Sequence, residues 1–308
     1  MQQLILMVGI PGSGKSTFVS QIAETLNNFE VVSSDVYRKI MFGSESCQEN
    51  GDILFRCIHT DIETFLKDGK TVIFDATNIK YKDRKQVLDI ARKVEKIYNI
   101  HIYKIAYVMH TSIEQCIIND AGRERKVTPT IIWKFAKNFN CPQYFEGFND
   151  IKFTNFSSYN CDAFNQFNEK MEHFDQCNPH HVYELGEHCR KLAQISFNEG
   201  EDEIFTMAAK LHDVGKLDTQ TFDSSGVAHY YNHENVSTLR AINFTSEAAF
   251  EINKDALLHM YFLINNHMKI RTIKTEKSIK KYKNLWGEDW FNELKRFEIY
   301  DNAACGEN

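Results

Sequence analysis

The sequence predicts an α/β domain, built on a parallel sheet with flanking helices, followed by an all-α domain. Three observations lead to this prediction. In the first half of the 308 residues, apolar runs alternate with helical patterns, which is typical of βαβ units. Beyond residue 180 only helical patterns follow. Nine of the twelve histidines lie from His173 onward, so we expect the two halves to carry different chemistries.

Each element is predicted from its own pattern. Short apolar runs predict buried strands at 4–8, 31–32, 71–74 and 102–109, with a last strand at 151–156. Helical patterns lie at 16–27, 48–68, 80–97, 111–120 and 129–140. The stretch 157–176 shows neither period nor apolar run and is interpreted as a connection. Further helices are expected at 180–198, 201–211, 233–242, 246–265 and 286–304, so the predicted domains are 1–156 and 177–308.

Composition narrows the class of protein. A net charge of −6 argues against a protein that coats long nucleic acid, although a local basic pocket can still hold an end. Eight cysteines without a C-x-x-C pair indicate reduced thiols. No apolar run reaches the length of a membrane span, and MQQLILMVGIPG leads straight into a motif without a signal-peptide pattern. We therefore expect a cytoplasmic protein that makes no membrane contact.

The first motif is GIPGSGKST at 9–17, which fits G-x-x-x-x-G-K-[ST] and lies between a predicted strand and a predicted helix. Backbone N–H groups of such a loop surround phosphates, and the helix N-terminus adds partial positive charge. Lys15 is expected to reach the β- and γ-phosphates, and the Ser16 hydroxyl to bind Mg²⁺. The motif predicts a site for ATP or another nucleoside triphosphate, formed by Gly9, Gly12, Ser13, Gly14, Lys15, Ser16 and Thr17.

Asp35 and Arg38 follow the second predicted strand, in SSDVYRK. Ligands bind at the carboxyl edge of a parallel sheet, and a carboxylate there can accept the proton of an attacking hydroxyl. A structural alternative is that Asp35 caps a helix and Arg38 is its surface partner.

The loop followed by S-x-D-x-x-R resembles the polynucleotide 5′-kinase branch of P-loop phosphotransferases. The resemblance implies that Asp35 activates a 5′-hydroxyl and that Arg38 holds the 3′-phosphate of the acceptor. It extends to VIFDATN, where Asp75 would support Mg²⁺ and Ser16, and to GRERKVTP, where Arg123 and Arg125 would close on the nucleotide phosphates. The alternatives are a strand-end cap for Asp75 and an exposed charged turn for the two arginines.

The second constellation is a series of histidines and aspartates in the predicted helical half. His212 and Asp213 adjoin in KLHDVGK, with His188 upstream and His233, His267 and Asp301 downstream. Imidazoles with carboxylates suit first-row metals, and an aspartate can bridge two ions.

The order H…HD…H…H…D resembles the HD-domain phosphohydrolases, an all-α family. The resemblance implies one metal held by His188, His212, Asp213 and Asp301, and a second held by Asp213, His233 and His267. Mn, Co, Ni, Cu, Fe and Zn all remain candidates. Lys216 matches the lysine of H-D-x-G-K and would hold a substrate phosphate; the alternative is a helix-end lysine.

Together the two motif sets resemble the HD-domain polynucleotide kinases, which heal broken RNA ends, with the order of the domains reversed. The resemblance implies 5′-phosphorylation and removal of 2′,3′-cyclic, 2′- or 3′-phosphates. The chain shows no K-x-D-G ligase motif, so a separate ligase would seal the ends.

Two other interpretations remain open. One is a small-molecule kinase fused to an HD nucleotidase, and the other is a nucleotide-sensing loop that regulates an HD hydrolase. The sequence does not decide between RNA and DNA as acceptor, although RNA is favoured. The oligomeric state, a homodimer included, is left open.

Overall fold

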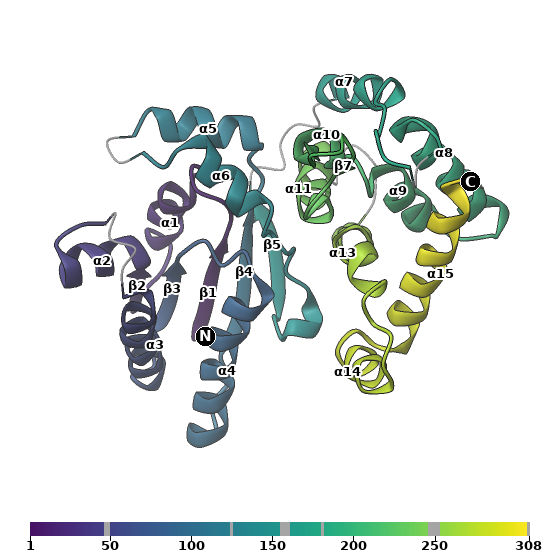
Figure 1. Ribbon diagram of the computed structural model, residues 1–308. Coiled ribbons are helices and arrows are strands. Elements are labelled where there is room, and N and C mark those ends of the chain that lie inside the picture. Colours follow the sequence, from purple (N-terminus) through teal and green to yellow (C-terminus); the bar gives the residue numbers. More distant parts are fainter. Residues whose placement is uncertain (46–49, 124–125, 155–160, 180–181, 246–252, 307–308) are drawn as a thin grey trace. The chain divides into compact units, whose positions relative to one another are not determined.

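The computed structural model describes residues 1–45, 50–123, 126–154, 161–179, 182–245 and 253–306 (Figure 1). The chain divides into two compact units. Unit 1 consists of Met1–Phe135 and Pro142–Asn155, and unit 2 of Ala136–Cys141 and Phe156–Asn308. Residues 136–141, predicted within the first domain, therefore group with the second unit.

Unit 1 is built on a five-stranded parallel sheet with the strand order β2-β3-β1-β4-β5 (Figure 1). The strands are β1 (Gln3–Val8), β2 (Phe29–Ser33), β3 (Thr71–Asp75), β4 (Tyr103–Met109) and β5 (Asp150–Thr154). Ile5 of the central strand β1 pairs with Ile73 on one side and Ile105 on the other. These aliphatic side chains are buried, as a sheet covered on both faces requires. The predicted parallel α/β architecture is confirmed.

Helices connect the strands of unit 1. They are α1 (Lys15–Ala23), α2 (Ser34–Phe42), α3 (Gly51–Lys67), α4 (Tyr81–Tyr98), α5 (Ile113–Ala121) and α6 (Pro129–Ala136), with the 3₁₀ turn η1 (Tyr144–Glu146). In α3 the residues Leu54, Ile58, Ile62 and Leu66 repeat every fourth position and are all buried, which explains why this helix was predictable. Helix α2 was not predicted, because it exposes Val36 and Ile40 and buries only Ser34.

Unit 2 is helical. Its elements are α7 (Cys161–Glu172), α8 (Leu185–Asn198), α9 (Glu203–Leu211), α10 (Lys216–Thr219), α11 (His233–Phe244), α13 (Lys254–Ile270), α14 (Glu276–Trp286) and α15 (Glu288–Ala304). A two-residue antiparallel ladder, β6 (Thr221–Phe222) with β7 (Ala228–His229), interrupts them, although no strand was expected. The ladder was not predicted because Thr221 and Phe222 are exposed and form no apolar run that sequence patterns could reveal.

Two predicted boundaries in unit 2 were wrong. The stretch interpreted as a connection contains α7, whose few apolar positions include the buried Met171. The helix expected at 286–304 begins only at Glu288, because Gly287 has a φ of 87° and separates α15 from α14. Part of the helix expected at 246–265 lies outside the described residues; α13 begins at Lys254.

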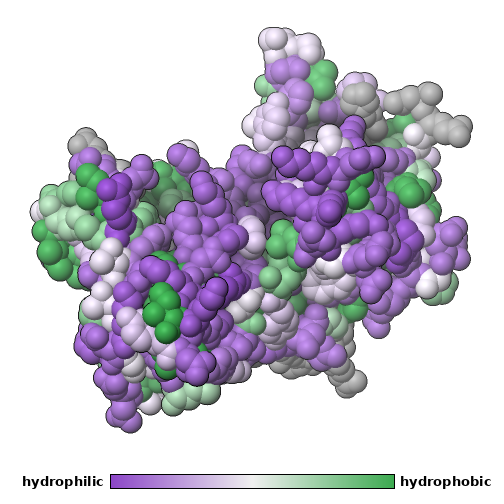
Figure 2. Space-filling model, turned by 90° about the horizontal axis from the view of Figure 1, so that it is seen from below, coloured by the Kyte–Doolittle hydropathy of each residue, from purple (hydrophilic) through white to green (hydrophobic). Residues whose placement is uncertain are grey.

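The surface is mainly hydrophilic on the face drawn in Figure 2, where apolar side chains form separate groups. Among the described residues, no helix combines the length and the apolar character needed to span a membrane.

Candidate functional sites in the two units

The loop between β1 and α1 has the backbone shape that phosphate binding needs. Gly12 and Gly14 have φ values of 79° and 87°, in the left-handed region that glycine adopts without strain. A Cβ on Gly12 would also lie 2.1 Å from the carbonyl oxygen of Cys116. The other predicted loop residues lie along the loop and the first turn of α1: Gly9, Ser13, Lys15, Ser16 and Thr17.

Ser16 and Asp75 are brought together at the end of the loop. Ser16 Oγ donates a hydrogen bond to Asp75 Oδ2 at 2.8 Å, and Asp75, the last residue of β3, is 8% exposed. The Lys15 ammonium donates to the carbonyl oxygen of Ile10 at 2.9 Å. Burial lowers the pKa of Lys15, and the carboxylates of Asp75 and Asp35 oppose this shift. A hydroxyl beside a buried carboxylate is a donor set that suits Mg²⁺.

Asp35 and Arg38 lie at the same edge of the sheet. Ser33, the last residue of β2, pairs with Asp75 on the neighbouring strand β3, and Asp35 follows two residues later in α2. Arg38 Nη1 donates to Asp35 Oδ1 at 2.8 Å. The ion pair is the arrangement that the structural alternative anticipates, yet it lies in the first turns of α2, directly after the strand that pairs with the one carrying Asp75.

The turn after α5 carries Arg123, one of the two predicted arginines. Arg123 is exposed there, and Arg125 lies outside the described residues. The buried Asp120 closes this turn: its carbonyl accepts from the Arg123 N–H at 3.1 Å, and its Oδ2 accepts from the Val127 N–H at 2.8 Å. Sequence reasoning missed Asp120, because an aspartate inside a helical pattern carries no signal of its burial.

Two further residues that sequence reasoning missed hold the phosphate-binding loop. Thr111 Oγ1 donates to the carbonyl oxygen of Ser13 at 3.0 Å, and Asn119 Nδ2 donates to that of Gly12 at 2.9 Å. Both are about a hundred residues away in sequence. Only the adjacency of β1 and β4 brings them to the loop.

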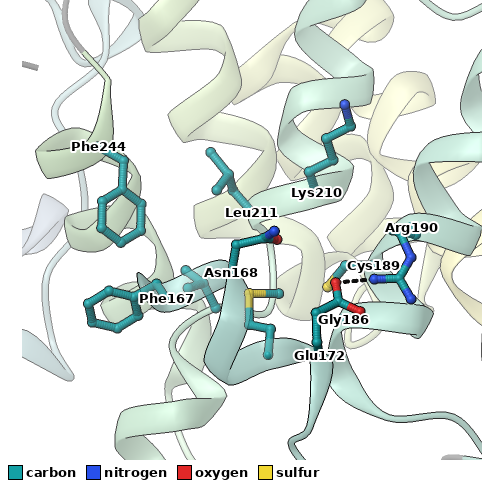
Figure 3. Close-up of a pocket in the computed structure, with 11 residues that line it drawn as sticks. Phe167, Asn168, Glu172, Gly186, Cys189, Arg190, Lys210, Leu211 and Phe244 are labelled. Atoms are coloured by element: carbon teal, nitrogen blue, oxygen red, sulfur yellow. Dashed lines mark hydrogen bonds and ion pairs between the residues drawn. The ribbon is translucent and has the colours of Figure 1, made fainter. Parts of the chain in front are cut away.

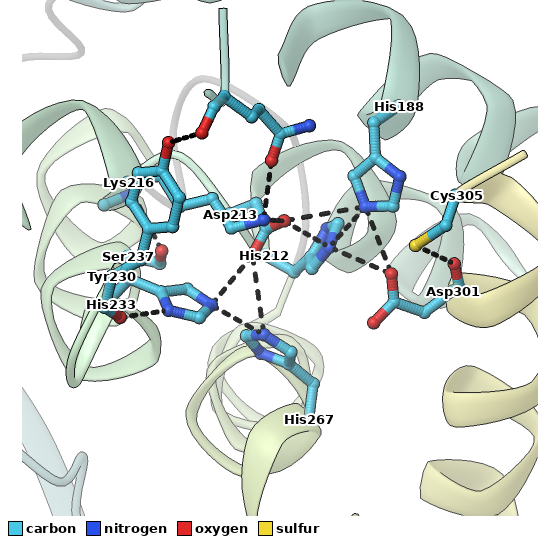
Figure 4. A network of polar contacts seen from close by, with 12 residues as sticks. His188, His212, Asp213, Lys216, Tyr230, His233, Ser237, His267, Asp301 and Cys305 are labelled. Atoms are coloured by element: carbon cyan, nitrogen blue, oxygen red, sulfur yellow. Dashed lines mark hydrogen bonds and ion pairs between the residues drawn. The ribbon is translucent and has the colours of Figure 1, made fainter. Parts of the chain in front are cut away.

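In unit 2, the six predicted metal ligands meet in the interior (Figure 4). They come from α8, the α9–α10 junction, α11, α13 and α15. Each is between 1% and 4% exposed: His188, His212, Asp213, His233, His267 and Asp301. Burying this many polar side chains costs free energy unless each finds a partner, so the cluster is a specific polar site and not a chance grouping of surface residues.

The four histidines present the same nitrogen to the interior. Nδ1 of His212, His233 and His267 lies 2.7–2.8 Å from the carbonyl oxygen three residues earlier in each case. Nδ1 of His188 lies 3.2 Å from the Ala304 carbonyl oxygen. Each carbonyl accepts the Nδ1 proton, which turns Nε2, the atom that a metal ion would bind, toward the interior of the cluster.

These Nε2 atoms and the carboxylate oxygens form two groups that share Asp213 (Figure 4). In one, His188 Nε2 lies 3.3 Å from His212 Nε2 and 3.1 Å from Asp301 Oδ1. In the other, His233 Nε2 lies 3.2 Å from His267 Nε2 and 2.9 Å from Asp213 Oδ1. Two ligand atoms about 2.1 Å from one ion, at tetrahedral or octahedral angles, are about 3.0–3.4 Å apart. The two imidazole–imidazole separations and that of His188 from Asp301 fall within this range, whereas Asp213 Oδ1 lies closer to His233 Nε2 and, at 3.6 Å, farther from His267 Nε2.

The charge states also suit cation binding. Burial opposes ionisation of Asp213, yet His212 and Lys216 hold its pKa well below the usual range. Burial lowers the pKa of His267 to about 4, which keeps this imidazole neutral near pH 7. Ionised carboxylates and a neutral imidazole are the forms that bind metals. His212 differs: burial opposes its protonation, yet Asp213 raises its pKa well above the usual range, so a metal ion at this imidazole must displace a proton.

Two cationic residues contact the cluster. Lys216 Nζ lies 2.7 Å from Asp213 Oδ2 and 2.8 Å from Gln176 Oε1. Arg271 Nη2 donates to Asp301 Oδ2 at 2.5 Å. Lys216 was predicted, whereas Arg271 and Gln176 were missed, because neither belongs to the H-D-x-G-K pattern and only the packing brings them to the ligands.

A separate cavity of about 280 Å³ lies next to the cluster in unit 2 (Figure 3). Its walls include Cys189, Leu211 and Val214, which are chain neighbours of the ligands, and an ion pair between Arg190 and Glu172. None of the six candidate ligands lines it. The cluster, rather than this cavity, therefore carries the candidate chemistry of unit 2.

Comparison with known proteins bears on unit 1. The family model AAA_33, described as an AAA domain, matches residues 4–133. These residues form a P-loop kinase-like domain. The match ends before His188, so the cluster of unit 2 lies outside the kinase-like domain.

Two curated relatives are named bifunctional polynucleotide phosphatase/kinase. The protein from Schizosaccharomyces pombe is 29% identical over 154 residues, which are 49% of this chain and 33% of that protein. The one from Acanthamoeba polyphaga mimivirus is 28% identical over 162 residues, 50% of this chain and 34% of that protein. The chain thus spans about a third of the length of these relatives. A structure of the Pnkp1/Rnl/Hen1 RNA repair complex is 23% identical, with 44% of this chain and 42% of that chain covered and a TM-score of 0.36, a likeness too distant to bear on function.

Proposed function

We propose that this protein heals the ends of broken RNA. A kinase domain in 1–156 transfers the γ-phosphate of ATP, or of another nucleoside triphosphate, to a polynucleotide 5′-hydroxyl. A hydrolase domain in 177–308 removes 2′,3′-cyclic, 2′- or 3′-phosphates with one or two divalent metals. The observation that carries the proposal is the coexistence, in one chain, of the Ser16–Asp75 phosphate-loop site and the buried cluster of four histidines and two aspartates.

The kinase role follows from the three adjacent strands β2, β3 and β1. Their carboxyl ends carry Asp35, Asp75 and the phosphate-binding loop at one edge of the sheet. Asp35 would accept the proton of the attacking hydroxyl. Arg38, which pairs with Asp35, would hold a phosphate of the acceptor. Lys15 and Arg123 would neutralise charge on the transferred group, while Ser16 and Asp75 would hold Mg²⁺.

The hydrolase role follows from the donor set of the cluster. The residues fit one or two first-row ions: His188, His212, Asp213 and Asp301 on one side, and Asp213, His233 and His267 on the other. A bound divalent ion supplies a water of lowered pKa. Lys216 and Arg271 are placed to hold the anionic oxygens of a terminal phosphate.

The names of the two curated relatives support the same substrate class, because both couple a polynucleotide kinase with a phosphatase. A 5′-phosphate and a free 3′-hydroxyl are the ends that many ligases need. A separate RNA ligase is therefore the partner that would consume the product.

One RNA tests both activities. A short oligonucleotide with a 5′-hydroxyl and a 2′,3′-cyclic phosphate is incubated with ATP, Mg²⁺ and Mn²⁺, and both ends are read by intact mass. We expect a 5′-phosphate to appear and the cyclic phosphate to disappear. Lys15→Ala should reduce the first change at least about 10²-fold, because it removes a charge that stabilises the transition state. His212→Ala should abolish only the second change.

Other outcomes would redirect the proposal. Unchanged RNA ends together with consumption of mononucleotides would make this a small-molecule kinase fused to a nucleotidase. Full phosphoryl transfer by Asp35→Ala would remove that residue from catalysis. Hydrolysis that responds to ATP without any transfer of phosphate would make the loop a regulatory nucleotide sensor.

A further inference from the structure

The end of α13, the linker after it and α14 form a strongly basic stretch of unit 2, here called the basic segment 269–283. It contains one acidic residue, Glu276, and carries a net charge of +6, although the whole chain carries −6. Its seven basic residues are Lys269, Arg271, Lys274, Lys277, Lys280, Lys281 and Lys283. Such a local reversal of charge requires a physical reason.

The lysines of the segment are exposed and unneutralised. Within the described part of the chain, only Lys283 pairs with a carboxylate, Glu288 Oε1 at 2.6 Å. The other five are exposed without such a partner: Lys269, Lys274, Lys277, Lys280 and Lys281. Some lysines on other helices do have acidic partners, such as Lys67 with Glu63 and Lys85 with Asp89.

This arrangement costs stability in the free protein. Lys277 lies three and four residues before Lys280 and Lys281, so the three ammonium groups share one face of α14. Like charges at this spacing repel one another and destabilise the helix. A bound anion would neutralise the ammonium groups and remove their mutual repulsion, and this relief would add to the affinity for the anion.

The segment is continuous with the metal-binding cluster. Arg271 lies one turn after His267, and its Nη2 donates to Asp301 Oδ2 at 2.5 Å. Its buried Nε has no hydrogen-bond partner among the described residues. The ammonium groups of Lys269 on α13 and Lys281 on α14 lie 5.6 Å and 5.2 Å from the ring centroid of Tyr282. The Lys269 contact links the end of α13 to α14, so the basic segment runs from the arginine that pairs with Asp301 into α14.

We infer that the basic segment 269–283 binds the sugar–phosphate backbone of a single-stranded polynucleotide whose phosphate-bearing end enters the cluster. The inference rests on the proposed hydrolysis of such ends. Ammonium groups act on phosphates as point charges, so the contact is independent of base sequence. It also explains how a chain of net charge −6 holds a nucleic acid: the attraction is confined to the strip beside the site.

The test compares a long and a minimal substrate. The variant Lys277→Gln/Lys280→Gln/Lys281→Gln removes three charges. The matched control is Lys80→Gln/Lys82→Gln/Lys96→Gln, at the N-cap of α4 and on α4, because these lysines of unit 1 are also exposed and pair with no carboxylate among the described residues. Each protein hydrolyses a 12-nucleotide RNA ending in 2′,3′-cyclic phosphate and a 2′,3′-cyclic mononucleotide over a range of salt concentrations. Binding of the same RNA, labelled at its 5′ end, is measured by fluorescence anisotropy.

For the 12-nucleotide RNA we expect the α14 variant to lose about tenfold or more in kcat/KM at low salt. Its log–log dependence on salt should become shallower by about 2, because each single-strand phosphate contact contributes about 0.7. Hydrolysis of the mononucleotide should stay unchanged, and the control variant should match the unsubstituted protein on both substrates.

Equal effects on both substrates, or RNA binding that is unchanged in the α14 variant, would overturn the inference. If the unsubstituted protein hydrolyses neither substrate, the proposed function fails, and anisotropy still decides whether the segment binds RNA. Loss of binding to phosphatidylserine vesicles in place of RNA would assign the segment to a membrane surface and also overturn it.

Discussion

Single residues of unit 2 are oriented mostly by short stretches of chain. His212, His233 and His267 each bond through Nδ1 to the carbonyl oxygen three residues earlier, so the local turn directs Nε2 away from the backbone. His188 differs, because its Nδ1 partner is Ala304 on α15. Three imidazoles are therefore oriented locally, whereas the fourth depends on the packing of α15 against α8.

In unit 1, Asp75 offers a test at the residue scale. Asp75→Asn keeps an acceptor for Ser16 Oγ but removes the negative charge beside it. We expect the Mg²⁺ concentration for half-maximal 5′-kinase activity to rise about 10–100-fold, because a group that orients a metal ligand typically contributes that much. A Mg²⁺ titration with a 5′-hydroxyl RNA measures it.

The exposed carboxylate of Asp83 on α4 provides the control, since Asp83→Asn makes the same chemical change away from the loop. If Asp75→Asn needs no more Mg²⁺ than Asp83→Asn does, Asp75 only ends its strand, and its proposed part in holding Mg²⁺ is wrong.

At the scale of elements, the approach of α10 to α11 is the tightest constraint on the cluster. A Cβ on Gly215 would lie 2.4 Å from the His233 carbonyl oxygen and 2.6 Å from the Ser237 backbone nitrogen. Gly215 N–H also donates to Ser237 Oγ at 2.9 Å. Because these contacts are with backbone, any larger residue must displace the start of α11, which carries His233.

We therefore expect Gly215→Ala to weaken metal binding at the cluster about tenfold or more and to destabilise unit 2 by about 1–3 kcal/mol. The measurement is the rise in melting temperature on titration with Mn²⁺. Gly51→Ala is the matched control, because a Cβ there meets nothing within 4 Å. If Mn²⁺ raises the melting temperature of Gly215→Ala as much as that of the unsubstituted protein, α11 accommodates the extra methyl group without moving His233.

Two helices that the sequence did not predict share one property. Helices α2 and α14 each bury a single residue, Ser34 and Trp286, so neither has the buried stripe that periodicity detects. In α14 a contact at the helix start contributes instead: Thr275 Oγ1 accepts from Ser278 N–H. Helix α3, with four buried residues at regular spacing, was predicted without difficulty.

At the scale of the whole molecule, each unit has its own core, a sheet in one and packed helices in the other. We expect two calorimetric transitions. ATP with Mg²⁺ should raise the midpoint temperature of one transition, and Mn²⁺ that of the other. At a ligand concentration of 100 times the dissociation constant, each shift corresponds to about 2.7 kcal/mol in the free energy of unfolding. Lys15→Ala and His212→Ala assign the transitions by abolishing one shift each. A single transition that both ligands raise would contradict independent units.

The sequence alone determined the parallel α/β fold of unit 1 and the helical character of unit 2, and it supplied the predicted phosphate-loop residues and metal ligands of the two candidate sites. These follow from local signals: apolar period, the glycines of the loop at Gly12 and Gly14, and residue types that suit phosphate or metal. Only the tertiary structure decided which side chains meet. It brings Ser16 to Asp75 across 59 positions and Arg271 to Asp301 across 30, and it closes the turn of Arg123 with Asp120. Contacts of this kind depend on strand order and helix packing, which no short stretch of sequence encodes.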